Sequence, residues 1–328
     1  STIYFAESVE RFAHNLREAQ PSMFFAVPRI WTKLREGITA RIPEHVLMRL
    51  LALPLLGALL ARTLRKQLGL GAARLVLSGA APLSAELHAF FAKLGIHIQE
   101  VYGMTEVGGA ATVSARAERD AGVGRPLPTA EVRLAPETDE ILIRAPWMMT
   151  EYFRDPERTA QVLQHGFVHS GDRGRFDARG NLHVIGRIND TFKTSKGKFV
   201  VPAQAEASIA GWAQIDQVLV TGRGLPQPIA LVSLSQAAQA QPREQLQAEL
   251  EQLLRALNAG LAPHERLSHL VVLDEPFSMD NGLLTPTLKI RRHGVDGRFE
   301  RSYEAWIKHP APIVWPAPLV PLPARANA

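Results

Sequence analysis

The sequence predicts an α/β protein in which a parallel sheet is followed by a small β-rich subdomain and then by a small α+β domain. Short apolar runs alternate with amphipathic helical segments up to Val101, which is typical of a parallel sheet with crossover helices. After Gly108 the chain changes to short strands separated by Gly, Pro and Asp. From Arg187 onward helices and strands are mixed, which indicates an α+β domain.

Length and composition exclude several classes of protein. The 328 residues are enough for about two domains, and the 46% hydrophobic and 21% charged shares exclude disorder of the whole chain. The net charge of +5 is too diffuse to indicate a nucleic-acid partner. Cys is absent, which removes disulfides, thiolate catalysis and Cys-type zinc sites. The His residues are scattered and form no metal-binding motif.

Helical and strand periodicity predict the elements of the parallel sheet. A helix is expected over Ala6–Ala19, where Pro21 stops it, followed by a strand over Ser22–Val27 and a second helix from about Arg29. Two further strands and a helix whose N-cap is Ser84 complete this part. These strands are Arg74–Leu77 and Ile96–Val101.

The remaining strands and helices are shorter and more varied. The β-rich subdomain is expected to contain strands at Val132–Leu134, Glu140–Arg144, Phe167–His169 and Leu182–Ile185. The α+β domain is expected to contain helices at Ala203–Ala210 and Arg243–Ala256 and strands at Gln217–Thr221, Ile229–Ser233 and Leu270–Leu273. We therefore expect domains at residues 1–187 and 188–309. The Pro-rich tail, residues 310–328, should be extended or disordered and lie outside the fold.

The string from Val101 to Glu106 is the sharpest chemical signal. It follows a predicted strand, as a ligand loop at the carboxyl edge of a parallel sheet should. Gly103 permits a tight bend, while Tyr102, Thr105 and Glu106 could stack a base, bond a phosphate oxygen and hold Mg²⁺. On chemistry alone, a strand-to-helix turn with solvated polar groups carries roughly equal weight.

Four other strings carry weaker signals. Gly79-Ala80-Ala81 follows a strand with small residues that let a ligand approach the backbone. Asp172 after Gly171 can accept two hydrogen bonds from a diol, and Arg187 can bind a phosphate, although Asp172 could equally be a turn residue. Ser195-Lys196-Gly197 and Lys289 each lie in basic segments that, taken alone, favour solvated charge clusters.

In this order and spacing, the strings resemble the adenylate-forming superfamily, and most of all its long-chain acyl-CoA synthetases (fatty acid–CoA ligases). Val27-Pro28-Arg29-Ile30-Trp31 is similar to a V-P-R signature of that branch. Asn281 to Lys289 supports the same branch. The resemblance covers nearly the whole chain up to about Arg292 and implies a partial large AMP-binding domain followed by a small mobile C-terminal domain.

The resemblance implies a role for each string in binding ATP, Mg²⁺ and a fatty acid. Gly79, Ala80 and Ala81 would line the adenine and acyl pocket, while Tyr102, with Gly103 beside it, would stack on adenine. Thr105 would contact the phosphates and Glu106 the Mg²⁺. Asp172 would hold the ribose hydroxyls with Arg187 close by, and Lys289 would be the adenylation lysine.

The resemblance also implies a second step, in which CoA displaces AMP from an acyl-AMP intermediate. The Ser195-Lys196-Gly197 loop would assist this thioester step, with Lys193 and Lys198 near the CoA phosphates. Asn189 would be the hinge about which the small domain rotates. Many relatives carry Asp or Lys at the Asn189 position and often Gly at the Lys196 position, so both are departures from the family pattern.

One family motif is missing from the sequence. The Ser/Thr/Gly-rich phosphate loop that ends in Pro-Lys-Gly is not found, and no Walker-type motif replaces it. We therefore expect the C-terminal part of a synthetase, with an N-terminal half absent. Two alternatives remain open: a non-catalytic nucleotide- or acyl-binding fragment that needs a partner half, and an acyl-AMP ligase that loads a carrier protein.

Localisation is predicted from the absence of export and membrane-spanning signals. Ser1–Glu10 lacks the basic start and apolar block of a signal peptide. The apolar run Leu50–Ala61 is shorter than the about 18 residues of a spanning helix. We expect a cytoplasmic protein. Because Arg62, Arg65 and Lys66 follow the run, a peripheral helix at the inner membrane face is an alternative to a helix that is buried or covered.

Overall fold

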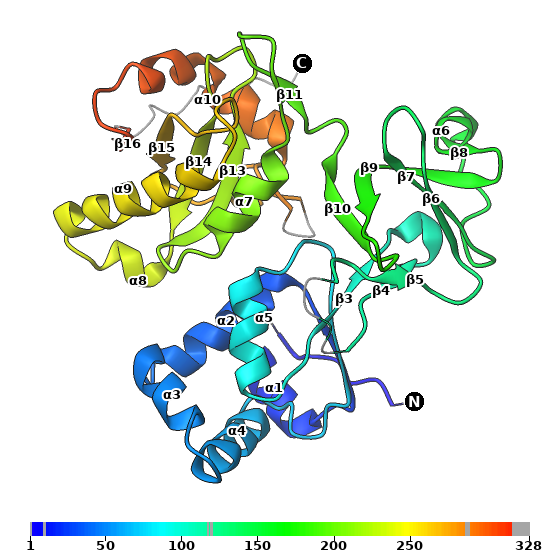
Figure 1. Ribbon diagram of the computed structural model, residues 1–328, viewed down its shortest axis with the longest axis vertical. Helices are drawn as coiled ribbons and strands as arrows, with labels where there is room; N and C mark the ends of the chain where they lie inside the picture. The colour runs from blue at the N-terminus through cyan, green and yellow to red at the C-terminus, as the bar shows by residue number, and fades with distance from the viewer. Residues whose placement is uncertain (1, 9–10, 117, 119–120, 286–288, 317–328) are drawn as a thin grey trace. The chain divides into compact units, whose positions relative to one another are not determined.

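The computed structural model describes residues 2–8, 11–116, 118, 121–285 and 289–316 (Figure 1). The chain folds into two compact units, unit 1 from Ser1 to Val184 and unit 2 from Ile185 to Ala328. The division falls within one strand, a few residues before the domain boundary expected from the sequence. Among the described residues, no helix combines the length and the apolar character needed to cross a bilayer.

Unit 1 is built on a mixed sheet with the strand order β1-β2-β3-β4-β5. Its strands are β1 (Met23–Ala26), β2 (Leu75–Ser78), β3 (Gln99–Tyr102), β4 (Thr112–Val113) and β5 (Arg125–Pro126). The first three strands are parallel, and the last two are antiparallel to their neighbours. The predicted α/β class is confirmed, since helices connect the parallel strands.

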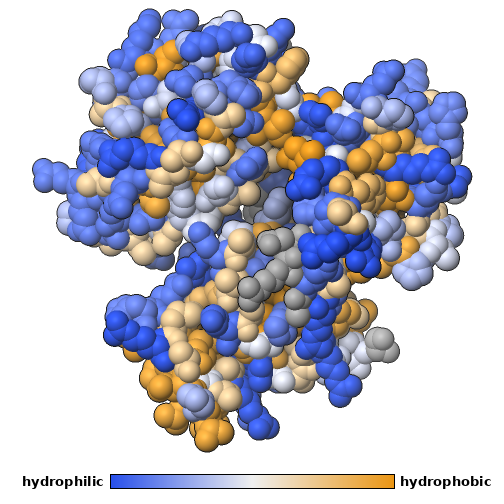
Figure 2. Space-filling model, in the orientation of Figure 1, coloured by the Kyte–Doolittle hydropathy of each residue, from blue (hydrophilic) through white to orange (hydrophobic). Residues whose placement is uncertain are grey.

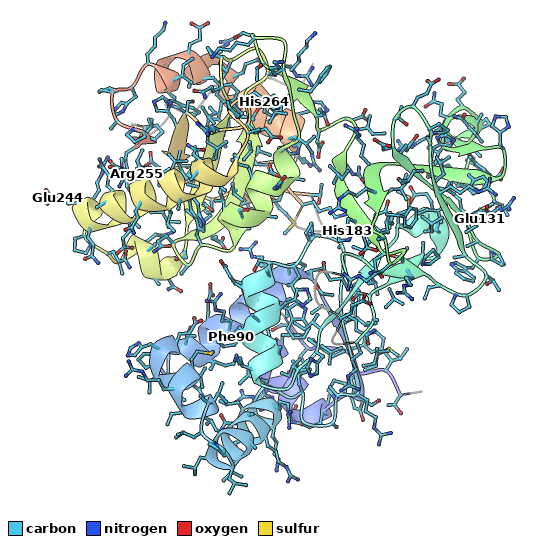
Figure 3. All side chains as sticks on the ribbon, in the orientation of Figure 1. Phe90, Glu131, His183, Glu244, Arg255 and His264 are labelled. Carbon is cyan, nitrogen blue, oxygen red and sulfur yellow. The ribbon has the colours of Figure 1, made fainter. Side chains whose placement is uncertain are left out.

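Five helices of unit 1 precede or connect the three parallel strands along the chain. They are α1 (Phe12–Ala19), α2 (Pro28–Thr39), α3 (Glu44–Leu51), α4 (Leu56–Gln67) and α5 (Ala85–Lys93). The core between them is aromatic: Trp31 of α2 contacts Phe24 and Phe91 edge to face. Phe90 of α5, labelled in Figure 3, packs against Phe91 and under the Arg35 guanidinium. Such edge-to-face packing holds α2 and α5 together.

The β-rich part of unit 1 is a second sheet with the order β10-β9-β7-β6, and β8 pairs with β9. The elements after β3 are η1 (Thr105–Val107), β6 (Glu131–Leu134), β7 (Glu140–Arg144), α6 (Pro156–Val162), β8 (Leu163–Gln164), β9 (Phe167–Phe176) and β10 (Leu182–Arg187). Its core contains Ile141, Ile143, Val168 and Leu182, all fully buried. This is the β-rich subdomain that the sequence predicts.

Unit 2 is a four-stranded sheet in the order β13-β14-β15-β16 with helices packed on it. Its elements are the hairpin β11 (Phe192–Lys193) and β12 (Phe199–Val200), then α7 (Pro202–Ala210), β13 (Ile215–Thr221), β14 (Ile229–Leu234), α8 (Gln236–Gln239), α9 (Arg243–Gly260), β15 (His269–Val272), α10 (Arg292–Ile307) and β16 (Ile313–Val314).

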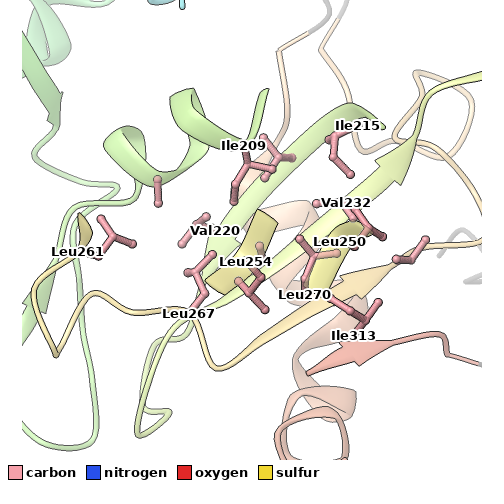
Figure 4. Close-up of a cluster of buried hydrophobic side chains, with 14 of the residues drawn as sticks. Ile209, Ile215, Val220, Val232, Leu250, Leu254, Leu261, Leu267, Leu270 and Ile313 are labelled. Carbon is pink, nitrogen blue, oxygen red and sulfur yellow. The ribbon is translucent and has the colours of Figure 1, made fainter. Parts of the chain in front are cut away.

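Both faces of the unit 2 sheet are covered. Alternate residues of β14 belong to different buried clusters, with Ala230 and Val232 in one and Ile229 and Leu231 in the other. Figure 4 shows the first cluster, in which Leu250 and Leu254 of α9 and Ile209 of α7 meet the sheet. The second contains Phe299, Tyr303 and Trp306 of α10.

Two predicted elements are shorter in the structure. The predicted helix Ala6–Ala19 begins only at Phe12, after the N-cap residue Arg11. The predicted strand Ile96–Val101 begins at Gln99: Ile96 and Ile98 are apolar because they are buried among the helices, and neither pairs in the sheet. Apolar runs thus predicted burial correctly but overestimated the extent of both elements.

The expectation that the chain leaves the fold at Pro310 is wrong for the first residues of the tail. Ile313 and Val314 form β16, a parallel edge strand on β15, and both are buried. The Leu270 N–H donates to the Pro312 carbonyl at 2.9 Å. Proline is tolerated here because Pro312 directly precedes the edge strand β16 and does not lie within it. Residues 317–328 of the predicted tail lie outside the described residues.

Candidate functional site

The candidate site of unit 1 is built on the carboxyl ends of β2 and β3. The register pairs Leu77 with Gln99 and Ser78 with Glu100 in parallel, so the loops that follow both strands leave the same edge of the sheet. A Cβ added to Gly79 would lie 2.8 Å from Val101 Cγ2. Glycine is therefore required at position 79, where the loop after β2 passes close to β3. Glycine at such a position is typical of a backbone that a ligand can approach closely.

The loop after β2 contains two features that point to a ligand. Ala80 has a φ of 70°, a conformation that costs a non-glycine residue free energy and is enriched at functional sites. The hydroxyl of Ser78 is buried and has no hydrogen-bond partner among the described residues. Ala81 is exposed. Buried polar groups are nearly always hydrogen-bonded, so an acceptor supplied by a ligand would give the Ser78 hydroxyl its missing partner.

Glu100 holds this loop in place. One carboxylate oxygen accepts the Leu83 N–H at 3.2 Å, and the other lies 3.0 Å from His88 Nε2 of α5. The Glu100 N–H donates to the Ser114 hydroxyl at 2.7 Å. Sequence reasoning did not single out Glu100. Its position opposite Ser78 becomes apparent only from the strand register.

Tyr102 and Asp172 come together although 70 residues separate them in the chain. The Tyr102 hydroxyl donates to Asp172 Oδ2 at 2.8 Å. Asp172 is almost buried, and its N–H donates to the Ser170 hydroxyl at 3.1 Å. The structure thus places an aromatic ring and a carboxylate, both predicted as site residues, beside each other.

A bulge in β9 presents Asp172 to this position. On β7 only Ile141 separates Glu140 from Leu142, whereas their β9 partners Arg173 and His169 are separated by Ser170, Gly171 and Asp172. Gly171 takes a φ of 70°, and its N–H donates to Glu140 Oε1 at 2.9 Å. Bulges re-aim side chains next to functional sites, and here the second carboxylate, Glu140, anchors the bulge.

Thr105 and Glu106 lie in η1, directly after Gly103. A Cβ at Gly103 would lie 2.5 Å from the Gly109 carbonyl oxygen, so the loop folds back on itself only with glycine there. Thr105 is exposed and Glu106 is half-buried. The loop therefore leaves the Thr105 side chain exposed, and its predicted contact with phosphates stays a prediction.

Tyr152 is the partner of Glu106 that sequence reasoning missed. Its hydroxyl donates to Glu106 Oε1 at 2.6 Å. The Glu106 carbonyl accepts the Met149 N–H at 2.7 Å. Burial and then the hydrogen bond to Glu106 raise the pKa of Tyr152, so its hydroxyl remains a donor at neutral pH. An aromatic residue in a loop rich in Met carried no signal of this role in the sequence.

Mg²⁺ fits the Glu106 side chain. Among the described residues, no group of three or more His, Cys, Asp or Glu side chains could hold a metal alone. Mg²⁺ is commonly held by one or two carboxylates together with substrate phosphates. The Tyr152 contact involves Oε1 of Glu106, and a carboxylate has further acceptor positions for a cation.

Arg187 and Asn189 lie at the start of unit 2. Both are exposed, Arg187 at the end of β10 and Asn189 in the turn that follows. The Thr191 hydroxyl donates to the Arg187 carbonyl at 3.2 Å and closes this turn. Arg187 and Asp172 belong to different units, so their predicted proximity stays a prediction.

An ion-pair network fixes the next residue of the same turn. Asp190 Oδ2 lies 2.9 Å from Arg292 Nε, and the Arg292 guanidinium also donates to Glu206 at 2.7 Å and to the Val220 carbonyl at 3.1 Å. Burial lowers the pKa of Arg292, but the carboxylates of Glu206 and Asp190 outweigh it and the pKa is raised. The turn that contains Asn189 and Asp190 is therefore anchored within unit 2. The sequence analysis did not single out Arg292.

The predicted loop Ser195-Lys196-Gly197 forms the tip of the β11–β12 hairpin. The Gly197 N–H donates to the Thr194 carbonyl at 2.9 Å, and the φ of Gly197 is 76°. The Ser195 N–H donates to the Leu225 carbonyl at 2.9 Å and ties the tip to a neighbouring loop. The side chains of Lys196 and Lys198 are exposed, and Lys193 Nζ lies over the Phe199 ring. The tip thus presents ammonium groups to solvent.

Lys289 directly precedes Ile290, which forms an isolated antiparallel bridge with Leu284. The Thr285 N–H donates to the Lys289 carbonyl at 2.8 Å, and the Lys289 N–H donates to the Thr285 hydroxyl at 3.1 Å. The backbone of Lys289 is thus fixed while its side chain is exposed. Residues 286–288 of this predicted motif lie outside the described residues.

One cavity of about 460 Å³ lies elsewhere in unit 1, between α1 and α2. Phe12, Ile30 and Leu34 line it together with Lys33. None of the predicted site residues lines it, so it contributes nothing to the site described above.

Two family models match the chain and decide its family. A model for AMP-binding enzymes matches residues 1–153, and a model for the C-terminal domain of AMP-binding enzymes matches residues 189–308. The chain belongs to the AMP-binding, adenylate-forming enzymes. It contains part of their large domain and their C-terminal domain.

Curated relatives of this adenylate-forming chain include two long-chain-fatty-acid–CoA ligases. Ligase 5 of Rattus norvegicus is 29% identical, over 88% of this chain and 49% of that protein. Ligase FadD15 of Mycobacterium bovis is 31% identical, over 75% of this chain and 44% of that protein. The chain spans about half the length of the curated relatives it matches.

Among solved structures, the chain is similar to the A-PCP didomain of carboxylic acid reductase from Segniliparus rugosus in complex with AMP. The TM-score is 0.71 at 25% identity, over 90% of this chain and 43% of that one. The likeness confirms the predicted fold class, a mixed α/β adenylation fold with its C-terminal domain.

Proposed function

We propose that this protein activates a carboxylic acid with ATP as an acyl-adenylate and then transfers the acyl group to CoA, and that the acid is a long-chain fatty acid. The observation that carries the proposal is the pair formed by Tyr102 and Asp172 at the carboxyl edge of the sheet, with Glu106 one turn further along. These groups match an adenosine and a metal-bound phosphate, and the family that binds AMP is the one to which the chain belongs.

Tyr102 and Asp172 would bind the adenosine portion of ATP. The Tyr102 ring would stack on adenine, and the backbone of Gly79, Ala80 and Ala81 would line the pocket. The strained φ of Ala80 indicates that the surrounding structure already imposes this backbone conformation. Asp172 would accept hydrogen bonds from the two ribose hydroxyls.

Thr105 and Glu106 would act at the phosphates. The exposed Thr105 hydroxyl would donate to a phosphate oxygen, and Glu106 would hold Mg²⁺. The cation would neutralise phosphate charge as pyrophosphate leaves. Tyr152 orients Glu106 through its hydrogen bond and so limits the carboxylate to one arrangement.

Lys289 would catalyse adenylation. The attacking carboxylate and the α-phosphate carry like charges, and a lysine ammonium between them stabilises the charge that gathers in the transition state. The fixed backbone and exposed side chain of Lys289 suit a group that must be delivered to a substrate.

The hairpin tip would serve the second step. Ser195, Lys196 and Gly197 would lie near the CoA thiol, and Arg187, Lys193 and Lys198 carry positive charge suited to phosphates. Asn189 would be the hinge at which unit 2 turns between the steps. Asn189 is exposed, whereas its neighbour Asp190 is held by the ion pair with Arg292. A rotation at Asn189 would therefore turn unit 2 without breaking that ion pair.

The relatives support a long-chain fatty acid as substrate and CoA as acceptor, because the two curated proteins are long-chain-fatty-acid–CoA ligases. A second candidate is an acyl-AMP ligase that loads a carrier protein. The likeness to the A-PCP didomain of carboxylic acid reductase favours it. The lysines of the 193–198 tip favour CoA.

The test is to assay the intact protein with ATP, Mg²⁺ and palmitate for pyrophosphate release, with CoA and then a phosphopantetheinylated carrier protein as acceptors. We expect palmitate-dependent release and a thioester of CoA. Asp172→Asn should weaken ATP binding about tenfold, whereas Asp139→Asn, a change at an exposed carboxylate of the same sheet, should not. Absence of acid-dependent pyrophosphate release would sink the proposal and leave the binding-only alternative; acyl transfer only to the carrier would favour the second candidate.

A further inference from the structure

The turn between α3 and α4 exposes a group of leucines. The chain from Leu50 to Ala61 contains no polar side chain, and the structure breaks it into the end of α3, a turn and the start of α4. Leu55 is 87% exposed, and Leu56 and Leu59 are each 64% exposed. The exposed leucines of this segment, which we term the apolar tip, are Leu50, Leu53, Leu55, Leu56 and Leu59.

The backbone holds the apolar tip outward. Leu55 has φ 59° and ψ −58°, and the Leu56 N–H donates to the Pro54 carbonyl at 2.6 Å. This is the strained form of the γ-turn, which is rare and persists only where its surroundings impose it. Gly57 is buried, and a Cβ there would collide with the Leu51 carbonyl, so α3 and α4 meet closely at the turn. The backbone at Leu55 is therefore strained although the Leu55 side chain is exposed to solvent.

Positive charge surrounds the apolar tip. No acidic residue occurs between Glu44 and Glu86 in the sequence. Arg49 lies beside the tip on α3, and Arg62 and Lys66 follow it on α4, all three exposed. Arg65 has a different role, since its guanidinium donates to the Leu94 carbonyl at 3.1 Å.

Exposed leucines are usually scattered, whereas these gather at one end of unit 1. Figure 2 shows the hydrophobic side chains together over the α3–α4 end of the molecule, with hydrophilic residues on the neighbouring surface. Soluble proteins rarely leave such a group bare unless something binds it. An apolar insertion bordered by Arg and Lys is the pattern of a segment that enters the headgroup region of an anionic bilayer.

We propose that the apolar tip docks this protein on the surface of an anionic lipid bilayer. The leucines enter the boundary between headgroups and acyl chains, while Arg49, Arg62 and Lys66 meet lipid phosphates. Charge complementarity selects this partner: a second copy of the chain would bring the same basic groups together and repel. The proposal does not depend on the chemistry at Tyr102 or Lys289.

The experiment is flotation of the intact protein, without ATP, with vesicles of phosphatidylcholine alone or mixed with phosphatidylglycerol. We expect binding to the anionic vesicles only, and weaker binding in high salt. The triple change Leu55→Ser, Leu56→Ser and Leu59→Ser should reduce the bound fraction about tenfold. The pair Arg62→Glu and Lys66→Glu should also reduce it.

Phe153→Ser is the matched control. Phe153 is 85% exposed on another part of unit 1, so the change removes a similar apolar side chain and should leave vesicle binding unaltered. Thermal unfolding should be unchanged in every variant, because each side chain is exposed. The proposal is overturned if the wild type fails to float, if the triple variant floats as well as the wild type, or if the tip instead drives self-association in light scattering.

Discussion

The two units hold their candidate functional side chains in opposite ways. In unit 1 each of the two carboxylates, Asp172 and Glu106, accepts a hydrogen bond from a tyrosine hydroxyl, at 2.8 and 2.6 Å. In unit 2 the side chains of Lys289 and Lys196 are exposed, while hydrogen bonds hold the backbone beside them. One unit fixes its carboxylates through side-chain hydrogen bonds, and the other exposes cations on a backbone that is held in place.

This difference fits the two-step reaction proposed above. Groups that bind the nucleotide would serve both steps and would gain from being fixed, because preorganised polar groups need no reorganisation when charge develops. Groups that act in one step only would be exchanged, so they would gain from an exposed side chain on a rigid body. Arg292 would contribute to that rigidity, since it joins the turn at Asp190 to Glu206.

Lys289→Met gives the largest expected effect. Removing the ammonium should slow adenylation by about a hundredfold, since one lost transition-state contact commonly costs that much. The melting temperature should stay the same because the side chain is exposed. Single-turnover rates of acyl-AMP formation, and of CoA transfer from synthetic acyl-AMP, separate the two steps. Lys308→Met is the control, and an equal loss in both steps would contradict the exchange of groups.

Arg292→Met should chiefly affect stability. The change leaves Asp190 and Glu206 without their partner, and we expect unfolding free energy to fall by about 2 to 3 kcal/mol, since both carboxylates are partly exposed. Urea unfolding monitored by circular dichroism measures it. Arg301→Met, an exposed change on the same helix α10, should cost little. Equal midpoints for the two variants would show that the network does not anchor the turn.

Tyr102→Phe should weaken ATP binding by about fivefold, since it removes one hydrogen bond and keeps the ring. Asp172 would then lack the donor that orients it. Calorimetric titration with ATP measures the change, and Tyr4→Phe, at an exposed tyrosine of unit 1, is the control. If Tyr102→Phe binds ATP as the wild type does, the pair is not a preorganised part of the site.

Tyr152→Phe gives the smallest expected effect. Without its donor Glu106 can reorient, and the Mg²⁺ concentration for half-maximal activity should rise about threefold while the rate at saturating Mg²⁺ is unchanged. Tyr102→Phe serves as the comparison and should leave the Mg²⁺ dependence unaltered. The opposite result, with Tyr102→Phe changing the Mg²⁺ response, would assign the metal to the Asp172 side of the site.

Local pattern was enough to predict most elements of the fold. Ser84 was expected as the N-cap of α5, and its hydroxyl does accept the Leu87 N–H at 3.3 Å. Each strand predicted for the β-rich part and for unit 2 overlaps a strand of the structure, but β9 extends from the predicted Phe167–His169 to Phe176, and β8 and β16 were not predicted. The run Leu50–Ala61 was expected as one helix, but the structure divides it between the end of α3 and the start of α4. The first part of α3 and the helices α6, α8 and α10 were not predicted, and α10 has an irregular distribution of charges.

What the sequence by itself determined is the family, the α/β class and the identity of Tyr102, Glu106 and Asp172 as chemically suited groups, because residue types at fixed spacings are written in the chain. Their pairing was decided only by tertiary structure. The contacts of Tyr102 with Asp172 and of Tyr152 with Glu106 join residues far apart in sequence, and a bulge in β9 sets the direction of Asp172. Such contacts depend on strand register, which no local pattern encodes.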